Sequence, residues 1–186
     1  MKRARTVIFF IFLFLGMFGC NEPTTDNEIV NISEIKQKII FISYYVNAAY
    51  DFTFDGLYID NQGNVYAFDL SDSEYSKPNF DISLPDYLAT MDGNELIGTV
   101  DKNELLKYYN MLLKVNVDAK EKTKPGACDM GTWVWEGVLG NDDKIMRTVL
   151  IYSTGDDEAY STDKYAKKIA KWLNDDPINL LNSETD

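Results

Sequence analysis

The sequence predicts an α+β domain with a mainly antiparallel sheet, built from two β-hairpins packed against about three helices. Two pairs of β-rich segments flank tight turn clusters, one at 60–63 and one at 140–143. Three other segments repeat apolar residues at helical spacing. Because tight turns join antiparallel neighbours, and the helical segments alternate with the strand pairs, we expect a single sheet with helices packed on it.

The first predicted helix covers residues 32–50. Apolar side chains recur there at steps of three and four, which would place them on one stripe of a helix. Asn31 and Glu34 have the spacing of a capping box at a helix start. The stripe consists of Ile32, Ile35, Ile39, Ile42, Val46 and Ala49.

Local signals predict the remaining elements. Ser83 before Pro85 is typical of a helix start, and Asp101 with Glu104 forms a second capping box. The loop at 120–125 holds the only locally basic run of the mature chain. In chain order we expect a hairpin of 54–59 and 64–70, a loop at 71–83, a short helix at 85–91, a strand at 95–100, a helix at 102–115, the loop at 120–125, a hairpin of 132–138 and 145–152, an acidic loop at 154–158, and a helix at 162–174.

The turn of the first hairpin has a partial likeness to a calcium-binding loop. Asp60, Gln62 and Asn64 have the spacing of the first ligands of an EF-hand. Val65 stands where that loop needs glycine, however, and no glutamate follows at the last ligand position. The cluster at 92–94 departs from the pattern in a similar way. Both clusters are interpreted as turns, and we expect neither a metal site nor a cofactor.

The most distinctive local feature is a pair of tryptophans in the second hairpin. Trp133 and Trp135 are two residues apart on a predicted strand, so they share one face of the sheet, and Glu136 points the opposite way. We expect both to be buried and to share one core with Trp172. The alternative is an exposed pair that stacks on sugar rings or anchors a protein partner.

The sequence offers few means of catalysis. It contains no histidine, which excludes Ser-His-Asp and Cys-His systems and most zinc sites. No glycine-rich phosphate loop or dinucleotide fingerprint is present. A carboxylate pair or a Ser-Lys arrangement remains, but with 30 acidic residues some pair lies close by chance. We therefore expect no catalytic site.

The amino-terminal end has the three parts of a secretory signal. Basic residues precede an apolar stretch, Val7 to Gly19, that is shorter than the roughly 20 residues of a membrane-spanning helix. The stretch ends in Gly16-Met17-Phe18-Gly19-Cys20, which resembles the lipobox of bacterial lipoproteins.

The resemblance to bacterial lipoprotein precursors covers only the first 20 residues. It implies cleavage before Cys20, a diacylglyceryl group on the Cys20 thiol, and a membrane-anchored protein of the cell envelope that faces away from the cytoplasm. Cys128 is then the only free thiol, and we expect it to be buried. The chain divides into a signal peptide at 1–19, a lipidated tether at 20–31, one globular domain at 32–174, and a loose tail at 175–186.

Charge and location together narrow the function. Removal of residues 1–19 takes away three basic residues and no acidic one, which changes the net charge from −12 to −15. Such a chain repels phosphates, so we expect no nucleic-acid partner. We expect a binding or protein-interaction module with a protein or glycan partner. The alternatives are an immunity or inhibitor protein that neutralises a toxin or hydrolase, and a carboxylate-dependent glycan hydrolase.

Overall fold

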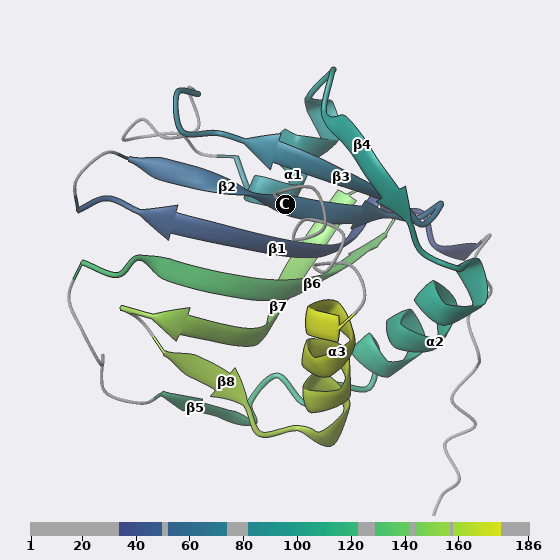
Figure 1. Ribbon diagram of the computed structural model, residues 1–186. Coiled ribbons are helices and arrows are strands. Elements are labelled where there is room, and N and C mark those ends of the chain that lie inside the picture. The colour runs from purple at the N-terminus through teal and green to yellow at the C-terminus, as the bar shows by residue number, and fades with distance from the viewer. Residues whose placement is uncertain are drawn as a thin grey trace, which may run out of the picture.

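The structure is a computed structural model, and it describes residues 34–49, 52–73, 82–122, 129–141, 144–156 and 158–175. Within these residues the chain forms eight strands and three helices (Figure 1). The strands make one sheet in the order β4-β3-β2-β1-β6-β7-β8-β5, and every neighbouring pair is antiparallel. The predicted α+β class with a mainly antiparallel sheet is therefore confirmed.

The elements alternate along the chain, with the three helices placed between and after the strands. The strands are β1 (Ile39–Asn47), β2 (Thr53–Asp60), β3 (Asn64–Asp69), β4 (Glu95–Thr99), β5 (Lys120–Lys122), β6 (Thr132–Asn141), β7 (Lys144–Gly155) and β8 (Ala159–Ser161). The helices are α1 (Leu84–Thr90), α2 (Lys102–Leu112) and α3 (Lys164–Asp175).

The predicted helix at 32–50 is wrong, because its central part is strand β1. This strand lies in the middle of the sheet between β2 and β6. Ile39 and Ile42 pack on one face, while Ile40 and Phe41 pack on the other. A strand buried on both faces has consecutive apolar residues. Ile39 and Ile42 of the helical stripe therefore belong to a continuous apolar run, residues 39–42, that is buried on both faces of the sheet.

Both predicted strand pairs are present, as β2 with β3 and β6 with β7. The sheet is nevertheless larger than two hairpins, since β1 joins the two pairs and further strands extend both edges. The predicted strand at 95–100 is β4. Residues 120–122, predicted as a loop, form β5 and pair with β8, which was not predicted. Strands of only three residues carry almost no apolar periodicity.

Side-chain caps start all three helices. The Ser83 hydroxyl accepts a hydrogen bond from the Asp86 amide at 3.4 Å, and Asp101 Oδ1 accepts from the Glu104 amide at 3.1 Å, as predicted. Asp163 Oδ1 accepts from the Tyr165 amide at 2.7 Å and serves α3 in the same way. Helix α2 ends at Leu112, three residues earlier than expected.

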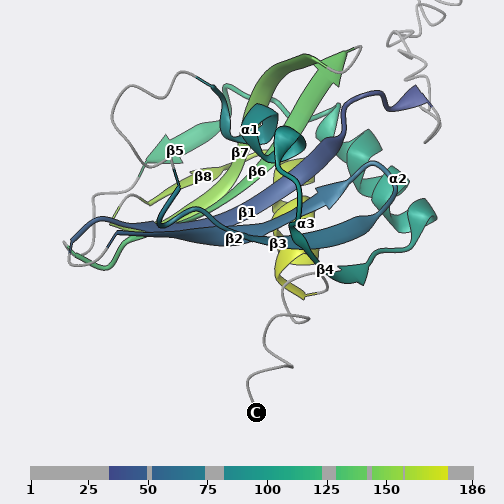
Figure 2. The ribbon, with the colours of Figure 1, turned by 90° about the horizontal axis from the view of Figure 1, so that it is seen from above.

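The sheet separates two hydrophobic clusters. Helices α2 and α3 pack beside one another on one face, and α1 covers part of the other face (Figure 2). The larger cluster contains Phe41, Trp135 and Trp172 together with the inner sides of α2 and α3. No helix in the described part of the chain is both long enough and apolar enough to cross a membrane.

Candidate functional site

The two predicted site residues, Trp133 and Trp135, lie in β6 on the face that α2 and α3 cover. Their ring centroids are 6.4 Å apart, which confirms the shared face. Trp135 is 7% exposed and belongs to the same core as Trp172, as expected. Trp133 is 42% exposed, so the prediction that it shares this core is wrong.

The position of α2 on the sheet explains the difference between the two tryptophans. Leu112, the last residue of α2, lies over Gly137 of β6, where an added Cβ would lie 2.3 Å from Leu112 Cδ1. Trp135 packs in the same core cluster as Leu112, and its ring centroid lies 5.3 Å from that of Tyr152. Trp133 lies four residues from Gly137, roughly 13 Å along the strand, where the strand extends past the helix.

The exposed Trp133 and the half-buried Tyr45 form a pair that we call the aromatic platform. The two residues are cross-strand neighbours on β6 and β1, and their ring centroids lie 4.8 Å apart. The Tyr45 hydroxyl donates a hydrogen bond to the Met130 carbonyl at 2.8 Å and accepts one from Asn47 Nδ2 at 2.9 Å. These bonds fix the tyrosine ring, and the tyrosine ring supports the exposed indole.

The loop beside the platform is also held in place. Both oxygens of the Asp156 carboxylate accept hydrogen bonds, from the Met130 amide at 2.9 Å and the Gly131 amide at 3.0 Å. Gly131 has a φ of 70°, and a Cβ there would lie 2.5 Å from the Tyr45 hydroxyl. Only glycine therefore allows this close approach. The platform is therefore a rigid surface. No pattern in the sequence had indicated Tyr45 as a binding residue.

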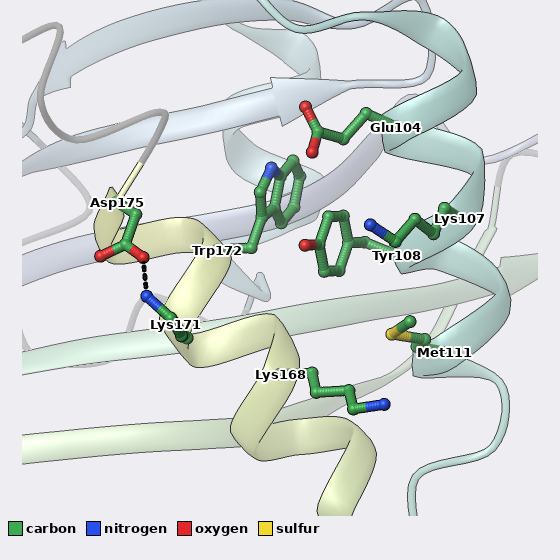
Figure 3. Close-up of a pocket in the computed structure, with 8 residues that line it drawn as sticks. All are labelled: Glu104, Lys107, Tyr108, Met111, Lys168, Lys171, Trp172 and Asp175. Atoms are coloured by element: carbon green, nitrogen blue, oxygen red, sulfur yellow. Dashed lines mark hydrogen bonds and ion pairs between the residues drawn. The ribbon is translucent and has the colours of Figure 1, made fainter.

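A second feature, which sequence reasoning missed, is a hollow between α2 and α3 that we call the lysine groove (Figure 3). Its volume is about 370 Å³. The Tyr108 ring stacks on Trp172 with centroids 4.2 Å apart and planes 9° from parallel. Lys107 and Lys168 extend into the groove from opposite sides. The residues that line it are Glu104, Lys107, Tyr108, Met111, Lys168, Lys171, Trp172 and Asp175.

The charges of the lysine groove contradict the expectation that 120–125 is the only basic patch. Helices α2 and α3 together carry six lysines and two acidic residues, in a chain whose net charge is −12. Lys171 forms an ion pair with Asp175, and this pairing raises the pKa of Lys171. Lys107 Nζ lies 4.7 Å from the centre of the Tyr108 ring. Lysines that are about 60 residues apart in the sequence form one basic surface.

A third feature is an acidic hollow of about 340 Å³ beside β3 and the start of β4. Asp69, Asp92 and Glu95 lie along it. The hydrogen bonds from Ser71 hold the pKa of Asp69 below its ordinary value. Partial burial, together with the Asp69 carboxylate on the neighbouring strand, raises the pKa of Asp55. Among the described residues, no group of three acidic, histidine or cysteine side chains is arranged to hold a metal ion.

The first cluster with partial calcium-loop spacing is a turn, as interpreted, and the second is a bent connection between α1 and β4. Asp60 Oδ1 accepts hydrogen bonds from the Gln62 and Asn64 amides, both at 2.8 Å. Asp60 Oδ2 accepts from Asn64 Nδ2 at 2.8 Å. The carboxylate thus holds its own turn between β2 and β3. Residues 91–94 connect α1 to β4, with Gly93 at a φ of 91°.

Glu136 is a partly buried carboxylate in the middle of the sheet. Burial raises its pKa above the ordinary 4.5, and Lys120 and a hydrogen bond with Thr148 oppose this rise only in part. Because the folded state holds the proton more tightly than the unfolded state, this group lowers the stability as the pH rises from below 4.5 through the folded-state pKa.

The variant Glu136→Gln is therefore expected to melt at a higher temperature than the wild type at pH 7, since glutamine has no charge to bury and keeps a partner for Thr148. The difference should shrink at about pH 3.5, where both states of the wild type are protonated. Melting curves followed by circular dichroism at the two pH values measure it. A difference that is equal at both pH values would contradict this role of Glu136.

Several sequence-based predictions concern residues outside the described part of the chain. These are the signal peptide, the lipobox with Cys20, the tether with the Asn31 cap, the location of Cys128, and the tail after Asp175. No protein-family model, curated protein sequence or solved structure matches the chain. The function is therefore inferred from the surfaces of the molecule.

Proposed function

We propose that the protein is a binding module of the bacterial cell envelope, held at the membrane by a lipid on Cys20, and that the aromatic platform contacts a protein partner. The observation that carries the proposal is the exposure of Trp133, which is 42%, on a support of fixed hydrogen bonds. A tryptophan that served only to fill the core would be buried, as Trp135 is.

The chemistry of the platform suits a protein contact. Tryptophan and tyrosine are enriched among the residues that contribute most to protein interfaces. A rigid aromatic side chain loses little conformational freedom on binding, so more of its contact energy remains as affinity. Met130 is 62% exposed beside the platform and adds an adaptable apolar contact. The platform therefore offers a small apolar centre with polar groups around it.

Photo-crosslinking in cells tests the proposal. A photoreactive phenylalanine analogue replaces Trp133, and the same analogue at Gln62 serves as the control, because Gln62 is exposed on the turn between β2 and β3. We expect a discrete adduct with one protein from position 133 and none from position 62. Separately, Trp133→Ala should release that protein from the purified complex. Absence of an adduct at position 133, or equal adducts at both positions, would contradict the proposal.

The anchor has its own test, because the lipid and the platform can fail independently. We expect Cys20→Ala to remain as an unprocessed precursor or to leave the membrane fraction, since the thiol that carries the diacylglyceryl group is lost. Cell fractionation and the migration of the protein on a gel measure both outcomes. Inhibition of the lipoprotein signal peptidase should make the wild-type precursor accumulate. A fully processed Cys20→Ala protein in the membrane fraction would contradict lipid anchoring.

The acidic hollow favours a second candidate function, the neutralisation of a basic toxin or hydrolase. Asp69, Asp92 and Glu95 present negative charge in a concave surface, which complements a basic partner. The crosslinking experiment distinguishes the two functions when the analogue is also placed at Asp92. An adduct from position 92 with a basic protein, and none from position 133, would favour the inhibitor.

A further inference from the structure

We propose that the lysine groove binds an acidic peptide segment of a partner protein. Lys107 and Lys168 hold carboxylates of that segment, and an apolar side chain of the segment rests on Tyr108 and Met111. The proposal does not depend on the aromatic platform or on the lipid anchor, because the groove lies between α2 and α3 and involves neither Trp133 nor Cys20.

Charge is the first reason for an acidic ligand. The two helices carry six of the chain's lysines and only two acidic residues, although the whole chain has 30 acidic residues. Asp175 is paired with Lys171. In the described part of the chain, no ion pair joins Lys107 or Lys168 to an acidic side chain. The groove is lined by Lys107, Lys168 and Lys171 against Glu104 and Asp175, so its lining has a net positive charge in a chain whose net charge is −12.

The shape of the groove suits an extended peptide better than the flat surface of a lipid bilayer. Lys107 belongs to one wall and Lys168 to the other, and each side chain points from its own helix toward the opposite one (Figure 3). A flat lipid bilayer could contact exposed lysines outside the groove, such as Lys102 and Lys167, but would not reach into the hollow between the two helices. A side chain of an extended peptide fits a hollow of about 370 Å³.

The apolar floor of the lysine groove explains why the ligand should carry an apolar group as well as charge. Tyr108 and Met111 are partly exposed there, while Trp172 beneath them is 3% exposed. The Trp172 ring packs edge-on against Phe41 with centroids 5.3 Å apart, so the stacked Tyr108 ring has a rigid support. A bare phosphate or sulfate would leave this apolar floor uncovered, whereas a peptide with leucine or phenylalanine between acidic residues would cover it.

The test uses the full-length chain, purified in a nonionic detergent, and titration calorimetry at low salt. The probe is a hexapeptide with four glutamates around a leucine-phenylalanine pair, and the control probe has glutamine in place of each glutamate. The variant Lys107→Gln with Lys168→Gln removes one lysine from each wall. The matched control, Lys102→Gln with Lys167→Gln, removes the same charge from the same helices outside the groove.

We expect the acidic peptide to bind and the glutamine peptide to bind at least tenfold more weakly. The groove variant should weaken binding of the acidic peptide by about tenfold, since each exposed charge pair contributes modestly. The control variant should weaken it by less than about threefold, because only long-range attraction is lost. Glu104→Gln should strengthen binding, since it removes an acidic side chain from the groove.

Three results would overturn the proposal. The first is equal weakening by the groove and control variants. The second is equal affinity for the two peptides. The third is binding to phosphatidylglycerol vesicles that both double variants lose equally, with no binding of the peptide, which would assign the lysines to a membrane surface. All four substituted lysines are exposed, so circular dichroism should show an unchanged fold in each variant.

Discussion

Replacing Trp135 with alanine is expected to lower the free energy of unfolding by about 3–5 kcal/mol. The side chain is 7% exposed and lies in the main core, so truncation leaves a cavity that the sheet and helices cannot fill. A loss of this size is a large share of the roughly 5–15 kcal/mol that stabilises a typical domain. Urea unfolding followed by far-ultraviolet circular dichroism measures it.

Trp133→Ala is the matched control, because the same residue type is removed two positions away on the same face of β6. Trp133 is 42% exposed and rests on Tyr45, so its loss should cost about 1 kcal/mol, the value of an aromatic pair. Trp135→Phe should cost less than Trp135→Ala, since the buried indole nitrogen has no hydrogen-bond partner in the described part of the chain. Equal losses at positions 133 and 135 would contradict the burial difference.

Gly56→Ala is expected to destabilise the domain by more than about 3 kcal/mol or to prevent folding. Gly56 lies in β2 directly opposite Tyr44 of β1. An added Cβ would lie 2.2 Å from the Ser43 carbonyl oxygen and 2.7 Å from the Tyr44 Cα. Both atoms belong to the backbone, so no side-chain rotation relieves the clash, and the two central strands would have to separate.

The control for this variant is Gly93→Ala, which adds the same methyl group where nothing lies within 4 Å. Gly93 has a φ of 91°, so alanine there costs about 1–2 kcal/mol of backbone strain and no more. Melting temperatures and far-ultraviolet spectra of the two variants give the comparison. A Gly56→Ala protein at least as stable as Gly93→Ala would show that β1 and β2 are not packed as closely as described.

Features that depend on a few neighbouring residues were predicted well. The caps at Ser83 and Asp101 and the turn held by Asp60 rest on hydrogen bonds over two to four residues. The strand pair β2 and β3 follows from the same turn. In each case the interacting residues lie within four positions of one another. The sequence pattern alone therefore shows which residues make the interaction.

Features that depend on what covers a segment were predicted poorly. The apolar residues in and before β1 fit the spacing of a helix and that of a buried strand equally well. Only its pairing with β2 and β6 and the burial of both its faces favour the strand. The alternation of β6 correctly placed Trp133 and Trp135 on one face, yet it carried no information about which part of that face the end of α2 packs against. Trp135 packs in the core with Leu112, the last residue of α2, whereas Trp133 lies farther along the strand and is exposed.

The sequence by itself determined the class of the fold, the positions of most turns and helix starts, and the net negative charge, because these follow from local spacing and composition. Tertiary structure alone decided the central position of β1, the exposure of Trp133 beside Tyr45, and the convergence of Lys107 with Lys168. The physical reason is that the net charge is the sum over all residues, wherever they lie. A binding surface depends instead on which distant segments pack side by side. An acidic chain can therefore present a basic groove.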